Sequence, residues 1–172
     1  MTELPHTVFS RCVDTGLQRL GNAVSWVWLI LLVVIVVNVV LRYLFAEGRI
    51  EFEEIQWHLY SAGFLMGMAS AYTTDSHIRV DVLHERCSDA TQAWIELYGI
   101  LLLLLPFIAL VIVSAIPFVE YSWATSEESE APGGLAYRWA IKGMLLVGFV
   151  LLLLAAIARL TRVWKFLFGK SE

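Results

Sequence analysis

The residues best placed to do chemistry in this chain are a glutamate and a histidine four positions apart, Glu54 and His58. On a helix this spacing brings both side chains to one face. The pair begins an apolar stretch that runs to Tyr72, and an ionisable residue inside a bilayer is a functional candidate because it is costly to place there. Glu54 stands at the start of the stretch, however, and His58 is one turn later. We therefore favour a structural pair at the membrane interface, packed against another subunit.

A second group of ionisable residues follows, where His77, Arg79 and Asp81 alternate with apolar residues. His84 comes shortly afterwards, so two histidines and an aspartate could in principle bind a metal, but their spacing matches no established ligand pattern. The alternation favours a segment that lies along the membrane surface. A haem is not expected either, because it needs facing axial ligands within the membrane and only His58 is there.

An acidic loop over residues 120–139 is the third candidate, and it carries four glutamates. Such a loop is either simply solvated or attracts a soluble partner with a positive surface, since complementary charge steers association. We favour docking. The residues expected to make the contact are Glu127, Glu128, Glu130 and Arg138.

The sequence contains nothing that resembles an active site, whether a nucleophile beside a base, a phosphate-binding loop or a pair of catalytic carboxylates. We therefore expect no catalytic, cofactor-binding or metal-ligating residue, and we do not expect an enzyme. The net charge of −4 is small and no basic run is present, which argues against a nucleic-acid partner.

The elements that carry these residues are membrane helices. Hydrophobic residues make up 59% of the chain, and the runs Ala23 to Leu41 and Ile100 to Val119 contain no charge. Each run is long enough to cross a hydrocarbon core of ~30 Å as a helix. The sequence predicts an all-α integral membrane protein, with residues 1–172 forming a single membrane domain. Its expected parts are a short amphipathic N-terminal helix on the membrane surface (1–22) and four spans, at about 23–44, 54–72, 94–119 and 140–161.

Three details refine this prediction. Pro106 lies inside the third span and should kink it, because proline removes an N–H and clashes with the preceding turn. Gly63, Gly67 and Ala71 recur every fourth position in the second span, which would let a partner helix approach closely. At the end of the fourth span, Arg159 and the cations that follow it are expected to extend outward to the lipid headgroups.

The distribution of cations predicts the orientation. Of the 12 Lys and Arg residues, eight lie in the two terminal segments and the middle loop, and four lie in the other two loops. Positive residues are retained in the cytoplasm, so both termini should be cytoplasmic and the acidic loop periplasmic. Cys12 and Cys87 then fall on the reducing side, and they form no CxxC pair that would indicate a disulfide enzyme.

Three stretches of the sequence carry a resemblance to a known family. The first is Glu53-Glu54 with Trp57 and the helix of Gly67 and Ala71, and the second is the segment from His77 to Asp81. The third comprises Glu128-Ser129, Gly133-Gly134-Leu135, Tyr137-Arg138-Trp139-Ala140-Ile141-Lys142 and Gly148-Phe149. In this order and spacing the chain resembles the small membrane subunit, of DctQ type, of the tripartite ATP-independent periplasmic (TRAP) transporters.

This resemblance implies a role in transport without catalysis. In such systems a periplasmic binding protein delivers an organic solute, often a carboxylate, to a membrane complex driven by a sodium gradient. The many-helix large subunit carries the solute and ion sites, while the small subunit supports its scaffold and helps to dock the binding protein. The small subunit would then meet the large one through Trp57, Gly63, Gly67 and Ala71, in the bacterial inner membrane.

Two other functions remain open at the level of sequence. A haem- or quinone-associated anchor subunit of a redox complex would give a coloured preparation. A self-contained small exporter that works as a homo-oligomer would need a central membrane carboxylate, for which Glu96 is the nearest candidate.

Overall fold

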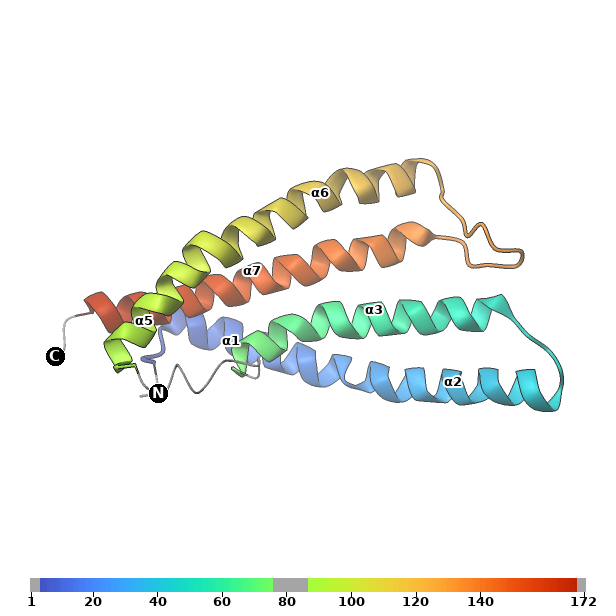
Figure 1. The fold of residues 1–172 in the computed structure, drawn as a ribbon, viewed down its shortest axis with the longest axis horizontal. Coiled ribbons are helices and arrows are strands. Elements are labelled where there is room, and N and C mark those ends of the chain that lie inside the picture. The colour runs from blue at the N-terminus through green and yellow to red at the C-terminus, as the bar shows by residue number, and fades with distance from the viewer. Residues whose placement is uncertain (1–3, 76–86, 170–172) are drawn as a thin grey trace.

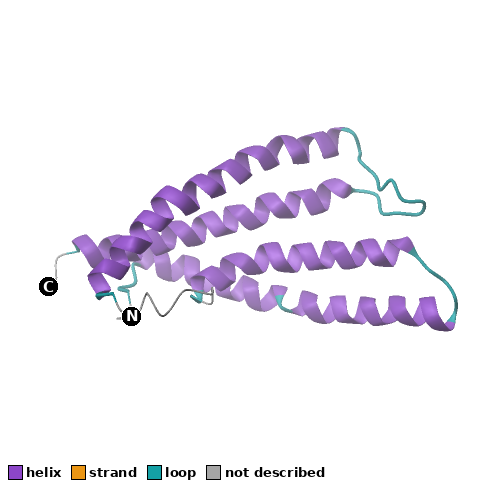
Figure 2. Ribbon diagram, viewed as in Figure 1, coloured by secondary structure: helices purple, strands orange, loops and turns teal. Residues whose placement is uncertain are grey.

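The computed structural model describes residues 4–75 and 87–169, and all of the regular structure in these ranges is helical (Figure 2). The predicted surface segment of His77, Arg79 and Asp81 lies outside the described residues. The elements are α1 (Val8–Val24), α2 (Trp26–Leu44), α3 (Ile50–Thr73), α5 (Asp89–Tyr98), a π-helix (Gly99–Leu104), α6 (Leu105–Ala124) and α7 (Arg138–Phe168).

The helices lie lengthwise beside one another, with α3 between α2 and α7, and α7 between α3 and α6 (Figure 1). Both ends of the chain lie at one end of the bundle, which we call the terminal end, together with α5 (Figure 1). The connections formed by residues 45–49 and 125–137 lie at the opposite end, which we call the loop end. This arrangement gathers the acidic segments at the loop end.

Three helical stretches of the described chain are long and apolar enough to cross a membrane: Val8–Leu44, Asp89–Ala124 and Arg138–Phe168. The remaining expected span, at about 54–72, corresponds to α3, whose 24 residues reach ~36 Å but include more polar side chains. Because α3 packs between α2 and α7, part of this polar surface is shielded inside the bundle. The predicted all-α membrane fold is confirmed.

The expected amphipathic N-terminal helix is α1, and it packs into the bundle. Thr7 caps α1, because its Oγ1 accepts a 3.0 Å hydrogen bond from the N–H of Ser10. The helix then runs into α2 with helical dihedral angles at Ser25. Buried Leu17 of α1 packs with Ala69 and Ala155 of the neighbouring helices. The apolar spacing that suits a membrane surface equally suits a bundle face, and here it joins α1 to α3 and α7.

The predicted interruption near Pro106 takes the form of the π-helix at Gly99–Leu104. The N–H of Leu105 bonds to the carbonyl of Ile100, five residues back, and Pro106 then stands in the first turn of α6. Proline lacks an N–H, so one carbonyl about a turn earlier loses its usual partner, and the hydrogen-bond pattern changes directly before the proline. The helix continues through Pro117 to Ala124.

Two glycines bring α3 close to its neighbours. A Cβ at Gly148 of α7 would lie 2.8 Å from the backbone oxygen of Leu65, and a Cβ at Gly21 of α1 would overlap the side chain of Ser70. In lipid, such close van der Waals packing is a main force that holds helices together. The closest internal packing of α3 therefore uses glycines on its partners.

We predict that Gly148→Ala destabilises the bundle by about 1 to 3 kcal/mol, the usual cost of overpacking, because the backbone of α3 must move away. Equilibrium unfolding in mixed detergent–SDS micelles measures the change. The matched control is Gly143→Ala on the same helix, where a Cβ meets nothing within 4 Å. That variant should be neutral or slightly stabilising, since alanine favours helix more than glycine does. Equal loss in both variants would contradict the close crossing.

Candidate functional site

The loop end is organised around the carboxylate of Glu54, which is buried. Its Oε1 accepts a hydrogen bond from Ser129 Oγ, and its Oε2 accepts one of 2.5 Å from the backbone N–H of Leu135. The guanidinium of Arg138 lies 3.8 Å from Oε1. One side chain of α3 thereby anchors the connection between α6 and α7 at three points.

The connection itself has a defined turn. The N–H of Ser129 donates to the carbonyl of Leu135 over 3.1 Å, and that of Gly134 donates to Ala131 over 2.9 Å. Gly133 has φ +79°, where a side chain would be strained, and a Cβ at Gly134 would overlap the side chain of Ser129. Both glycines are therefore needed for the path that brings Ser129 and Leu135 to Glu54.

A second ion pair closes the base of the loop. Lys142 of α7 donates a hydrogen bond to the carboxylate of Glu127, and the N–H of Arg138 donates to the Glu127 carbonyl over 3.2 Å. The hydrogen bond from Lys142 holds the pKa of Glu127 below its ordinary value of 4.5, against an opposing effect of burial, and the charge of Arg138 adds to the lowering. Glu127 is therefore ionised at neutral pH.

Acidification should loosen this loop. Because the folded-state pKa of Glu127 is lowered, its ion pair stabilises the loop above the ordinary pKa of 4.5, and this stabilisation is lost as pH falls through the folded-state pKa. We expect a spin label at Pro132→Cys, in a chain whose own cysteines are replaced, to become more mobile over that window. Glu127→Gln should be more mobile at pH 7 and should show a weaker acid response. An unchanged acid response in this variant would assign the transition to another group.

The docking residues predicted from the sequence thus divide into two pairs. Glu127 and Arg138 are engaged within the chain, with Lys142 and Glu54 respectively. Glu128 and Glu130 are exposed. A soluble partner would meet the second pair directly, while the first pair holds the loop in shape.

The predicted side-chain pair of Glu54 and His58 does not form. His58 Nδ1 lies 2.6 Å from the backbone carbonyl of Glu54, while the Glu54 carboxylate turns to the loop. This is a local contact across one helical turn, so it does not set up proton exchange between the two side chains. Within the described residues, no three His, Cys, Asp or Glu side chains gather as metal ligands would.

One face of α3 is open to a partner. Trp57 is 64% exposed, Tyr60 and Phe64 are also exposed and stack at 6.3 Å, and a Cβ at Gly67 would meet nothing within 4 Å. Helical periodicity places Ala71 on the same side. We call these five residues the open face of α3. It includes the small residues Gly67 and Ala71, as helix contacts in membranes do.

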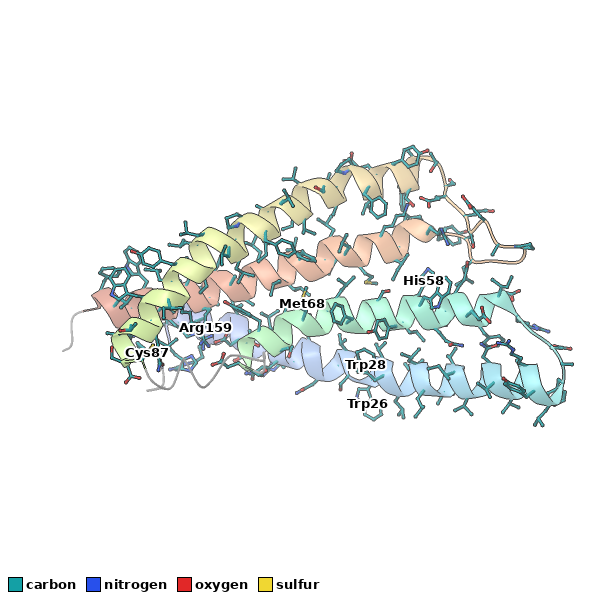
Figure 3. The ribbon with its side chains drawn as sticks, in the orientation of Figure 1. Trp26, Trp28, His58, Met68, Cys87 and Arg159 are labelled. Atoms are coloured by element: carbon teal, nitrogen blue, oxygen red, sulfur yellow. The ribbon has the colours of Figure 1, made fainter. Side chains whose placement is uncertain are left out.

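Gly63, which the sequence places on the same surface, lies instead at the contact with α2. It is buried, and a Cβ there would lie 3.3 Å from Trp28 Cζ2 of α2. The Trp28 ring lies between α2 and α3 and meets Tyr60 edge to face at 5.8 Å (Figure 3). A step of four residues rotates around a helix by about 40°, so Gly63 points toward α2 while Gly67 remains open.

The terminal end holds two buried arginines, which corrects the expectation that these cations reach out to headgroups. Arg159 Nε donates to Glu96 Oε1 over 2.5 Å, and its Nη2 lies 3.4 Å from Asp75 (Figure 3). Arg162 Nη1 lies 3.5 Å from Asp14 of α1. A charged side chain near a helix end can be buried when another helix supplies its counter-ion. These pairs tie α7 to α1, α3 and α5.

The anchoring role of Glu54 is not predicted by the sequence. The available signal is weak: a carboxylate at the start of an apolar helix, and a distant loop with a serine and two adjacent glycines. Glu54 and Ser129 are 75 positions apart, so no local pattern connects them. The same holds for Arg159 and Glu96, which are 63 positions apart.

Comparison with known proteins assigns the chain to a family. The family model described as "Tripartite ATP-independent periplasmic transporters, DctQ component" matches residues 31–166, which is well over half of the chain. No curated protein and no solved structure matches it. The matched region begins in α2 and ends in α7, so it includes Glu54, the acidic loop and the open face of α3. The chain therefore belongs to the family of DctQ components of the tripartite ATP-independent periplasmic transporters.

Proposed function

We propose that this chain is the small accessory subunit of a sodium-driven transporter that imports an organic solute, a carboxylate in the commonest case. It would hold the scaffold of a many-helix large subunit and help to dock a periplasmic binding protein. The family match supports the transporter role, and we propose the sodium coupling and the solute class from what the resemblance implies. The large subunit would carry both of those sites, in keeping with a chain that shows no metal cluster among its described residues.

The observation that carries the proposal is the open face of α3. Small residues on a helix face let the backbone of a partner helix approach closely, which a helix surrounded by lipid does not need. Trp57 and Gly67 lie on this face without a close neighbour in the bundle, while other faces of α3 pack on α2 and α7. We propose that this face meets the large subunit through Trp57, Gly67 and Ala71.

The loop end supports the docking part of the proposal. Its connection is fixed by Glu54 and by the ion pair of Glu127 with Lys142, so the exposed Glu128 and Glu130 are held on an ordered loop. A preorganised charged surface binds a partner with less loss of freedom than a mobile one. We propose that the loop end is periplasmic and the terminal end cytoplasmic, because eight of the 12 cations of the chain fall, by sequence, in the two terminal segments and the middle loop and only four in the other two loops.

Uptake into proteoliposomes tests this function. The large subunit that co-purifies with the chain is reconstituted with and without it, and its binding protein is added with a radiolabelled carboxylate under an inward sodium gradient. We expect uptake to need both membrane subunits and the gradient. Full uptake by the large subunit alone would contradict the accessory role, and uptake without a gradient would contradict sodium coupling.

A further inference from the structure

We propose that the loop end carries a receptor site for a single cationic side chain, arginine or lysine, of the docking protein; this deepens the docking role and rests on it. The site is a hollow of about 480 Å³ between the end of α6 and the start of α7. Its walls are Trp123, Ser126, Glu128, Ala136, Tyr137 and Trp139.

The walls of the hollow are aromatic. The rings of Trp123 and Trp139 meet edge to face with centroids 4.5 Å apart, and Trp123 remains 61% exposed. Tyr137 is 71% exposed at the same hollow. The face of an indole or phenol ring carries negative potential and attracts an ammonium or guanidinium group within about 6 Å.

The charge of the hollow points to a cation. Glu128 lines it and forms no ion pair with any other described residue. The cations at the start of α7 are engaged elsewhere: Arg138 lies beside Glu54, and Lys142 pairs with Glu127 while standing 4.2 Å from the centroid of the Phe118 ring. An incoming guanidinium would thus find a carboxylate and ring faces without an internal competitor, and an anion would be repelled.

The backbone at the hollow fixes one of its walls. Tyr137 has φ +65°, in the left-handed region that a residue with a bulky side chain rarely adopts. Hydrogen bonds on either side hold it there, from the N–H of Arg138 to the Glu127 carbonyl over 3.2 Å and from that of Ala140 to the Tyr137 carbonyl over 2.9 Å. The Tyr137 ring is thereby held at the hollow.

A second hollow lies against the same tryptophans. It measures about 450 Å³ and is lined by Trp123, Trp139, the exposed carboxylate of Glu120 and apolar side chains of α6 and α7. The tryptophan pair therefore stands between two carboxylates, Glu120 and Glu128. The aliphatic stem of an arginine or lysine fits against such apolar walls while its charged head remains near a carboxylate.

The probe for this site is the peptide acetyl-Gly-Arg-Gly-amide, with citrulline in place of arginine as the uncharged control of the same shape. The full chain, purified from native membranes with any partner that it retains, is labelled with 5-fluorotryptophan and placed in phosphatidylglycerol nanodiscs. The ¹⁹F resonance of Trp123 is assigned through Trp123→Phe. We expect the arginine peptide to shift this resonance saturably at millimolar concentrations, and the citrulline peptide to leave it unchanged.

Three variants test the assignment. Glu128→Gln should weaken the binding of the arginine peptide by about fivefold or more, since it removes a charge-assisted contact. Glu130→Gln makes the same change on the same loop but outside the hollow, and should leave the affinity unchanged. Tyr137→Asn removes the ring but introduces a residue that tolerates the left-handed backbone, so it should also weaken the binding of the peptide.

Equal shifts with arginine and citrulline, or equal affinities for Glu128→Gln and wild type, would overturn the proposal. Loss of the peptide response when phosphatidylcholine replaces part of the nanodisc lipid would overturn it too, because the cationic choline headgroup would then be the occupant of the site. The peptide titration involves no transport, so a failure here leaves the uptake result intact. Conversely, a failed uptake experiment alongside a saturable arginine shift would reject the transporter role and keep the cation site.

Discussion

Replacing Arg159 with methionine should destabilise the bundle by about 3 to 5 kcal/mol, the typical cost of breaking a buried ion pair from one side. Arg159 is 5% exposed, and its guanidinium contacts Glu96 of α5 and Asp75 at the end of α3. Methionine preserves much of the stem but removes the cation that Glu96 Oε1 and Asp75 contact. Equilibrium unfolding in mixed detergent–SDS micelles measures the loss.

Two controls separate this pair from a general loss of positive charge. Lys165→Met removes an exposed cation from the same helix and should change stability by no more than about 0.5 kcal/mol. The double variant Arg159→Met with Glu96→Gln should be more stable than the sum of the single losses predicts, because both members of the ion pair are then neutral. Additive losses would show that Arg159 and Glu96 do not stabilise the fold as a pair.

Replacing Gly67 with leucine should reduce the large subunit recovered with the chain by about tenfold or more, equivalent to ~1.4 kcal/mol of association free energy. A Cβ at Gly67 meets nothing within 4 Å inside the bundle, so the leucine side chain would project from the open face of α3 and hold a partner helix away. Quantitative mass spectrometry of the material that co-elutes with the tagged chain measures the ratio.

The stability of the isolated chain distinguishes a lost contact from a lost fold. Gly67→Leu should unfold at the same SDS fraction as wild type, because the space it fills is empty. Gly16→Leu on α1 is the matched control, since a Cβ there also meets nothing within 4 Å and the residue lies at the terminal end. Undiminished recovery of the large subunit with Gly67→Leu would remove the open face of α3 from the interface.

Much of the fold follows from the sequence because lipid imposes strong local constraints. A run such as Ala23 to Leu41 must satisfy its own backbone groups, so its length and composition predict a helix without reference to the rest of the chain. Pro106 likewise acts on its own neighbourhood in the chain, and the hydrogen-bond pattern changes directly before it. The motifs around Trp57 and Tyr137 were enough to indicate the family that the family model then matched.

The pairing of distant polar groups is harder to predict from the sequence than the helices are. Glu54 could have contacted His58, lipid headgroups or the loop, and only the folded bundle selects the loop. Small residues are ambiguous in the same way, because each permits a close approach without saying by what. Gly63 accommodates Trp28, Gly67 is open, and Gly148 meets the backbone of α3. Sequence periodicity places such residues on a helix face, and it does not say which neighbour that face will meet.

The most direct test of the account is a gentle-detergent purification of the tagged wild-type chain from its native membranes, followed by mass spectrometry of the intact complex. We predict a stoichiometric partner that is a much larger, many-helix membrane protein. Recovery of this chain alone, of a homo-oligomer, or of a complex with a haem absorption band would contradict the accessory-subunit role.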